Sequence, residues 1–233
     1  MSRFEMRVFG ALLLLMPLLI ALSWTGLIIH YDYPDILRAP VEVILHNYHE
    51  GGLTLRMYWA GMVLASLLII PIVLLFRRLT GQNNPSLSVA AAGIGLASAI
   101  FHVAGFSRWL FAVDYLAMQY AGHDSPTTAA QREAIEILFH TLHWYLGVTL
   151  GETLGFATMG VWAILIAVAL YRSGYLKVWL LALSIGSGIG IMAGTLEWAG
   201  LSVAVTINAY AYQLWILIIA YMGTSFLLRR KHP

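Results

Sequence analysis

The sequence contains no cysteine and few charged residues. Only 10% of its 233 residues are Asp, Glu, Lys or Arg, and 60% are hydrophobic, whereas a soluble domain carries about 25% charge. The low charge predicts a membrane protein. The missing cysteines exclude disulfides, thiolate metal ligands and cysteine nucleophiles. The formal net charge of +2 is small and forms no basic stripe, which argues against nucleic acid as a partner.

The sequence also has no stretch that looks like a linker. No Pro-, Ser- or Gly-rich segment, charge block or low-complexity tract divides it, so we predict one integral membrane domain over residues 1–233. Serine-nucleophile, zincin and phosphate-loop motifs are missing, and no catalytic residue is predicted. Six apolar runs have about the 20 residues that cross a bilayer. They cover residues 8–29, 56–76, 86–107, 147–171, 178–200 and 205–228.

Basic residues favour one side of this six-span arrangement. Nine lie on one side and four on the other, and positively charged loops stay in the cytoplasm. We therefore predict an all-α polytopic bundle in the lipid bilayer of a bacterial cytoplasmic membrane, with both termini in the cytoplasm. The nine are Arg3, Arg7, Arg77, Arg78, Arg172, Lys177, Arg229, Arg230 and Lys231, and the four are Arg38, Arg56, Arg108 and Arg132.

Two similar octamers lie in the predicted outer connections. EVILHNYH and EILFHTLH each place Glu, His and His at i, i+4 and i+7, on one face of a helix. We predict two outer interfacial helical segments. Converging side chains would suit Zn(II), Cu(II) or Fe(II), or two histidines would hold a b-type haem. The candidate metal ligands are Glu42, His46, His49, Glu136, His140 and His143, with His102 as a further candidate.

The same histidines have simpler interpretations. On amphipathic outer helices, histidines prefer the boundary between water and lipid, where they bond to Glu or to the backbone. Clustered histidines also respond to pH without a metal. His102 shares a helical stripe with Ser98 and Gly105, where it would be a packed, hydrogen-bonded side chain. The sequence leaves these alternatives open.

Polar residues inside the spans form a second group. Glu152 and Glu197 lie in the outer thirds of their predicted helices, where a carboxylate is costly and marks a functional candidate. Arg108, at the outer end of its span, is the expected partner of one of them, and Asp114 would share it. These residues would lock helix ends together, handle protons or contact a ligand.

Glycines at every fourth position accompany both carboxylates. Such strips let helix backbones approach closely in lipid, so we predict that the fourth and fifth spans meet along them. The strips are Gly147, Gly151 and Gly155 in one span and Gly186, Gly190 and Gly194 in the other.

Four segments resemble a known family. They are GFSRWLFAVDYLA from Gly105, LGETLGFATMGVW from Leu150, YRSGYLKVWL from Tyr171 and YQLWILIIAYMG from Tyr212. In them the chain resembles six-span bacterial membrane proteins grouped as domain of unknown function 4386. The resemblance covers most of the second half of the chain and implies the six-span architecture. It implies no activity, so Arg108 acquires no role from it.

Three functions fit these features. The first is an outward-facing metal or haem protein for redox chemistry, metal handling or sensing, which requires the octamers to converge. The second is a non-catalytic accessory subunit that packs against other membrane protein subunits. The third is a small-molecule or proton transporter using Arg108, Glu152 and Glu197; the lack of inverted repeats weighs against it.

Overall fold

The computed structural model describes residues 1–122 and 127–228, and within these ranges every regular element is a helix. Six rods are long and apolar enough to cross a membrane, so the prediction of an all-α six-span bundle is confirmed. The rods are Arg3–Tyr31, Val41–Thr80, Pro85–Tyr120, Ala129–Arg172, Val178–Ala199 and Val203–Leu228. Several extend past the predicted spans because their helices continue into amphipathic residues that hydropathy alone does not detect.

Several rods combine more than one type of helix. The first rod is α1 (Arg3–Tyr31), which the short 3₁₀ helix η1 (Asp35–Arg38) joins to α2 (Val41–Thr80). The third rod contains α3 (Pro85–Arg108), the π-helix η2 (Trp109–Val113) and α4 (Asp114–Tyr120). The fourth contains α5 (Ala129–Leu142), the π-helix η3 (His143–Leu154) and α6 (Gly155–Arg172). The last two are α7 (Val178–Ala193) with the 3₁₀ helix η4 (Gly194–Ala199), and α8 (Val203–Leu228).

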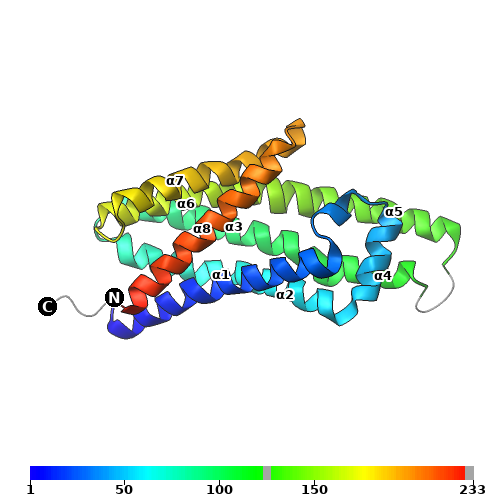
Figure 1. Cartoon of the computed structure of the whole chain (residues 1–233), viewed down its shortest axis with the longest axis horizontal. Helices are drawn as coiled ribbons and strands as arrows, with labels where there is room; N and C mark the ends of the chain where they lie inside the picture. Colours follow the sequence, from blue (N-terminus) through cyan, green and yellow to red (C-terminus); the bar gives the residue numbers. More distant parts are fainter. Residues whose placement is uncertain (123–126, 229–233) are drawn as a thin grey trace.

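The six rods form a ring in which each packs against the next, and α8 closes the ring on α1. The N-terminus and the last turn of α8 lie at one end of the bundle, whereas α4 and α5 lie at the other (Figure 1). We call these the terminal end and the outer end. At the terminal end Gly10 of α1 lies against Gly223 of α8. Toward the outer end, α1 and α8 diverge (Figure 1).

Three rods are far longer than a bilayer requires. A helix of about 20 residues crosses the apolar core, and the second, third and fourth rods have 40, 36 and 44 residues. Their surplus forms the outer end of the bundle. There α2 bends at Gly52, whose φ of 49° and ψ of −132° suit a residue without a Cβ. The first part of α2 consequently lies across the bundle rather than along it (Figure 1).

Both octamers are helical, as predicted, but neither is a separate segment. The octamer from Glu42 to His49 occupies the first part of α2, before the bend. The octamer from Glu136 to His143 runs along α5 and ends at the first residue of η3. Each therefore continues into a membrane-spanning helix, and its position is tied to that helix.

The first glycine strip contacts a different helix from the one predicted. A Cβ added at Gly105 of α3 would lie 2.8 Å from the Cα of Gly151 in η3, so the two backbones touch. Gly155 faces the ring of His102, also in α3. The prediction that this strip meets the fifth span is wrong. Four-residue spacing creates a flat face, but the packing of the ring decides the direction in which that face points.

The second strip packs mainly against α8. A Cβ at Gly190 would contact Ala211 of α8, and one at Gly194 would contact Asn208 of the same helix. Nothing lies within 4 Å of a Cβ added at Gly186. The contact between α6 and α7 is made instead at Gly160 and Gly188.

Candidate functional site

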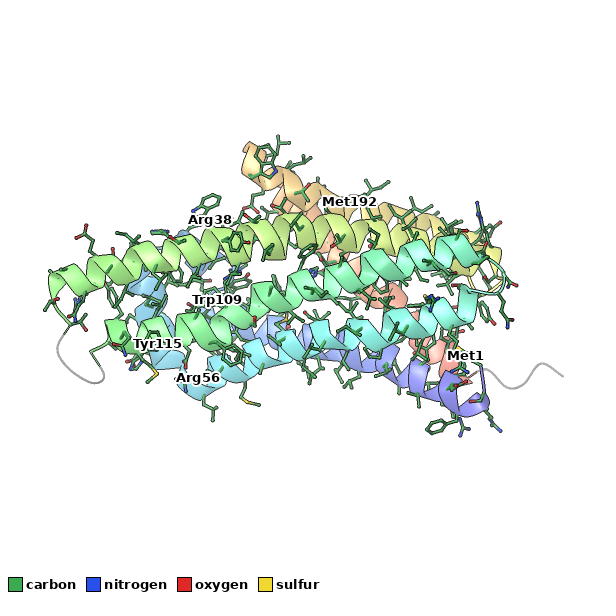
Figure 2. The ribbon with its side chains drawn as sticks, turned by 180° about the vertical axis from the view of Figure 1, so that it is seen from behind. Met1, Arg38, Arg56, Trp109, Tyr115 and Met192 are labelled. Carbon is green, nitrogen blue, oxygen red and sulfur yellow. The ribbon has the colours of Figure 1, made fainter. Side chains whose placement is uncertain are left out.

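Buried aromatic side chains form a layer across the outer half of the ring. Trp59 of α2 and Trp109 of η2 stack, with ring centroids 4.7 Å apart and planes inclined by 6°. Each such contact contributes about 0.5–1.5 kcal/mol beyond burial. Trp109 lies inside the bundle, far from Met1 at the terminal end (Figure 2). The aromatic layer consists of Tyr31, Tyr33, Tyr48, Trp59, Trp109 and Phe139.

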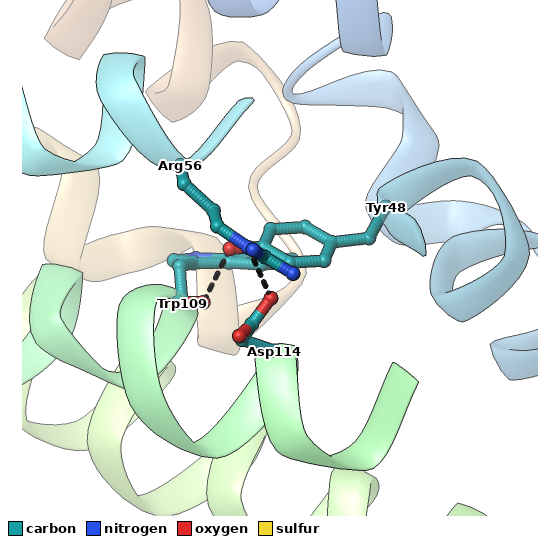
Figure 3. Close-up of polar contacts among 4 residues, drawn as sticks. All are labelled: Tyr48, Arg56, Trp109 and Asp114. Carbon is teal, nitrogen blue, oxygen red and sulfur yellow. Dashed lines mark hydrogen bonds and ion pairs between the residues drawn. The ribbon is translucent and has the colours of Figure 1, made fainter. Parts of the chain in front are cut away.

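Two polar contacts hold η2 and α4 against α2 (Figure 3). The Tyr48 hydroxyl donates a hydrogen bond to the Trp109 carbonyl oxygen at 2.6 Å. The Arg56 Nε donates to Asp114 Oδ1, also at 2.6 Å. The prediction that Asp114 shares Arg108 is therefore wrong, because Arg56 reaches it from α2, four residues after the bend.

Arg108 ends α3 next to the aromatic layer. Its side chain is buried, with 6% of the residue exposed, and its Cζ lies 5.3 Å from the Trp109 ring centroid. The guanidinium rests on the backbone of Gly147, where an added Cβ would come within 2.6 Å of Cζ. Nη1 donates to the Gly105 carbonyl oxygen at 3.1 Å.

That is the one hydrogen bond of the guanidinium within the described residues, although an arginine has five N–H donors. No carboxylate of residues 1–122 or 127–228 lies within 4.0 Å of it. The expected ion pair with Glu152 or Glu197 is thus not formed. Glu197 lies in η4 and is exposed, whereas Glu152 is half-buried in η3. Arg108 remains a buried charge without a paired carboxylate.

Other polar groups of the same region lack hydrogen bonds as well. Nε1 of Trp59, Nε1 of Trp109 and Nδ1 of His143 are buried and have no partner in the part of the chain that the structure describes. The Glu152 carboxylate and the Tyr33 hydroxyl also make no hydrogen bond to described residues. Buried polar groups in native proteins nearly always have partners. The three buried groups are exceptions to this rule, and a fourth, Trp162 Nε1, lies apart from them against Phe76 and Trp215.

The charges of this region act on one another. Arg108 and Glu152 interact electrostatically, and both act on Tyr33. Burial raises the pKa of the Tyr33 phenol well above its usual value, the Glu152 charge raises it further, and the Arg108 charge lowers it. The Tyr33 hydroxyl consequently stays protonated at physiological pH and can donate a hydrogen bond.

The helix geometry changes around Arg108. The π-helix η2 begins directly after it, and the π-helix η3 runs beside it and contacts the 3₁₀ helix η4. π-Helices are rare and recur at functional sites. Arg108 lies about 34 Å from the start of α3 at 1.5 Å per residue. It is thus near the limit of an apolar core about 30 Å thick.

The octamers do not converge on a metal centre. Within the described ranges, no group of three or more His, Cys, Asp or Glu side chains is placed to hold a metal ion. Glu136 instead accepts a hydrogen bond from the Tyr120 hydroxyl at 2.9 Å. Glu42, His46 and His140 are exposed, and His49 and His143 are half-buried. The metal or haem site stays a prediction without support from this geometry.

His102 is held by contacts on both ring nitrogens. Its Nδ1 lies 2.8 Å from the Ser98 carbonyl oxygen, and its Nε2 lies 3.0 Å from the Tyr212 hydroxyl. The interpretation as a packed, hydrogen-bonded histidine is confirmed. Because Tyr212 belongs to α8, the contact also links α3 and α8 across the interior.

The sequence matches the family described as domain of unknown function (DUF4386) over residues 8–228. This chain is a DUF4386 protein. The match spans nearly the whole chain and confirms the resemblance of the four sequence segments. No curated protein and no solved structure matches it. The DUF4386 description names no activity.

Much of the site of this DUF4386 protein had no distinguishing signal in the sequence. Tyr31, Tyr33 and Trp59 look like ordinary aromatic residues of a membrane interface, where such residues are expected. They come together in one buried layer only because α1 with the connection after it, α2, η2 and α5 pack against one another. The one local signal is the placement of Trp109 directly after Arg108 at the end of a span.

Proposed function

We propose that this protein binds the anionic group of a small molecule at Arg108, in the outer part of the membrane. The observation that supports it most is the buried guanidinium with one hydrogen bond and no carboxylate within 4.0 Å among the described residues. Burying an unpaired charge costs several kcal/mol. The planar guanidinium matches the two oxygens of a carboxylate or phosphate, and a bound anion would compensate that cost.

The surroundings favour the same role. Tyr33 and the indole N–H groups of Trp59 and Trp109 are donors without partners in the described chain. Arg108 is only 6% exposed and lies beside Trp109 of the aromatic layer, and charges attract more strongly in a buried site than in water. Binding would be the first step of recognition or of transport, which the sequence already offered as a function for Arg108.

Ligand-induced stabilisation tests this proposal, because a ligand that binds only the folded state raises its stability. Purified protein would be screened by thermal unfolding against small carboxylates, small phosphates and a lipid extract. The matched variants are Arg108→Gln and Arg38→Gln, since Arg38 is exposed and, within the described residues, forms its ion pair with Asp35. We expect a shift in the wild type and in Arg38→Gln that Arg108→Gln loses. An equal shift in Arg108→Gln, or no shift with any probe, would refute the proposal.

We also infer that the terminal end faces the cytoplasm of a bacterium, which the excess of basic residues supports. Six of the nine lie in the described chain; Arg229, Arg230 and Lys231 lie outside it. Because the sequence has no cysteine, single-cysteine variants report the topology directly. In intact cells, a membrane-impermeant thiol reagent should label Glu50→Cys at the outer end and spare Ser86→Cys. Labelling of Ser86→Cys alone would reverse the orientation.

The metal or haem role of the octamers needs a separate test. Protein purified without added metal would be compared with a His46→Ala/His143→Ala double variant by elemental analysis and absorption spectroscopy. Stoichiometric metal or a Soret band that the variant loses would establish a site, and a blank in both would remove this function. The accessory-subunit role also stays a prediction. Five of the six strip glycines pack within this chain, which leaves Gly186 for a partner.

A further inference from the structure

The helix α5 at the outer end has little contact with the rest of the bundle. Among residues 129–142, all of which the structure describes, only Phe139 is buried. In α6, which belongs to the same rod, nine of the 18 residues are buried. α5 continues the line of α6 away from the terminal end (Figures 1 and 2). It therefore packs on the bundle along one side and leaves the other side free.

The side of α5 that packs on the bundle is centred on Phe139. Phe139 contacts Trp109 of the aromatic layer. Arg132 lies over the ring of Tyr120, and Glu136 accepts a hydrogen bond from the hydroxyl of the same tyrosine. Residues three, four and seven positions apart share one side of a helix, so Arg132, Glu136 and Phe139 define the inner side. The opposite side points away from the protein.

That opposite side is apolar and exposed, and we call it the α5 face. Its large side chains are far from buried, with Ile137 62%, Leu138 46%, Trp144 60% and Tyr145 61% exposed. No Asp, Glu, Lys or Arg belongs to it. Exposed apolar patches of this kind mark interaction sites. The α5 face consists of Ala134, Ile137, Leu138, Thr141, Trp144 and Tyr145, the last two at the start of η3.

The bilayer does not cover the outermost part of this face. Exposed apolar surface begins beside Arg172, at Val178 and Trp179 of α7, which places one membrane surface there. Ile137 lies about 50 Å from Arg172 along the rod, at roughly 1.5 Å per residue. A bilayer with its headgroups is about 40–45 Å thick. Ile137 and Leu138 consequently lie in water beyond the other membrane surface, where exposed apolar side chains are unfavourable.

We propose that the α5 face is the contact surface of a parallel dimer, formed by two copies of this chain in one membrane. Membrane insertion gives every copy the same direction, so a twofold axis along the membrane normal sets two α5 helices parallel and side by side. Twofold dimers use the same patch on both copies and are the commonest symmetric assemblies. Ala134, Ile137 and Thr141 follow steps of three and four residues, the spacing by which paired helices interlock. The proposal is independent of any ligand at Arg108.

The charges of the outer end support a second copy as the occupant. Asp32, Glu42 and Glu50 are exposed and form no ion pair within the described chain, whereas Arg38 and Arg56 are already paired. Copies that met through these surfaces would bring like charges together, which is costly. The α5 face has no charge that would select a partner of either sign. An equally uncharged apolar surface complements it, and the chain itself supplies one.

The residues at the edges of the α5 face are compatible with this dimer. Glu133 and His140 lie along one edge of the helix, and Leu138 lies along the other. In a parallel pair each edge meets the opposite edge of the second copy. The Glu133 side chains of the two copies therefore lie on opposite sides of the contact, and no carboxylates face each other.

Single-cysteine variants of the full chain test the parallel arrangement, because the sequence has no cysteine. Next to a twofold axis, each residue at the centre of the contact lies beside its own counterpart. We expect Ala134→Cys and Thr141→Cys, made separately, each to form disulfide-linked dimers when membranes are oxidised. Glu50→Cys is the matched control, since Glu50 is exposed on α2 at the same end. It should crosslink at least tenfold less.

Dilution of the purified full chain in detergent measures the strength of the dimer. Ile137→Glu would place a carboxylate in the centre of the contact, where an unpaired charge is costly, so the dissociation constant should rise at least tenfold. Val43→Glu is the matched control, because Val43 is 38% exposed on α2 at the outer end; its dissociation constant should equal that of the wild type. Thermal unfolding checks that each variant is folded, and Thr141→Lys replaces Ile137→Glu if that variant is not.

Four results would overturn the proposal. The first is a wild type that is monomeric at every concentration, including one that copurifies with a different protein through the α5 face. The second is a dimer that a folded Ile137→Glu or Thr141→Lys variant does not weaken. The third is crosslinking of Glu50→Cys as extensive as that of Ala134→Cys. The fourth is crosslinking at only one of the two positions 134 and 141, which excludes the parallel arrangement.

Discussion

The backbone contact between Gly105 of α3 and Gly151 of η3 positions the candidate site, and Gly105→Ala tests it. The added Cβ would lie 2.8 Å from the Gly151 Cα, whereas carbon atoms pack at about 3.5–4.0 Å. The two helices must separate by roughly 0.7–1.2 Å to reach that spacing. A side-chain rotation cannot relieve the clash, because the neighbour is backbone. Overpacking of this kind costs about 1–3 kcal/mol.

Gly93→Ala is the matched control in the same helix. Nothing lies within 4 Å of a Cβ added at Gly93, so the substitution only improves helix propensity, by about 0.5–1 kcal/mol. The same gain applies at Gly105. The difference in free energy of unfolding between the two variants should therefore equal the overpacking cost, about 1–3 kcal/mol.

Reversible unfolding of the purified protein in detergent measures this difference. We expect Gly93→Ala to be slightly more stable than the wild type and Gly105→Ala to be less stable. Gly105→Ala should also weaken any ligand-induced shift that depends on Arg108, because moving η3 takes Gly147 away from the guanidinium. Two variants of equal stability would refute the contact between α3 and η3.

Three further predictions concern the outer end. Tyr48→Phe leaves the buried Trp109 carbonyl without its hydrogen bond, so the free energy of unfolding should fall by about 1–3 kcal/mol; no loss would show that this carbonyl finds another donor. A double-mutant cycle on Arg56 and Asp114, whose side chains are 40% and 21% exposed, should give a coupling of about 0.2–1 kcal/mol, and a larger value would mean that the pair is shielded from water. Burial raises the pKa of Tyr33, so its neutral form stabilises the fold at low pH, and this contribution is lost as the pH rises above about 10. Alkaline unfolding curves should therefore fall less steeply for Tyr33→Phe than for the wild type, and parallel curves would contradict the burial of the phenol.

The six spans could be predicted because hydropathy and length are local properties. Each run was recognised from its own residues, and the structure lengthened all of them except the fifth, which ends at Ala199. The octamers were correctly placed on helices, but they belong to α2 and α5–η3 because those helices extend past the apolar residues. The bend at Gly52 was not predicted, since a glycine between two helical patterns does not indicate the direction of a turn.

The candidate site was predicted only in part. Arg108 and Glu152 were recognised as polar residues at an unusual depth, yet the predicted ion pair is not formed. Asp114 pairs instead with Arg56 of α2, and this contact could not be predicted because it joins residues 58 positions apart in the sequence. The π-helical geometry of η2 and η3 was not predicted either.

The sequence by itself determined that this DUF4386 protein is a six-span helical membrane protein without thiol chemistry, with most basic residues at one end. Composition and hydropathy are enough to predict these properties, because each property depends only on residues that are close together in the sequence. The tertiary structure alone decided that the first glycine strip faces α3, that six aromatic side chains form one layer and that Arg108 keeps no paired carboxylate within the described chain. These properties depend on how each helix is rotated and tilted against its neighbours, and packing of the whole ring sets both.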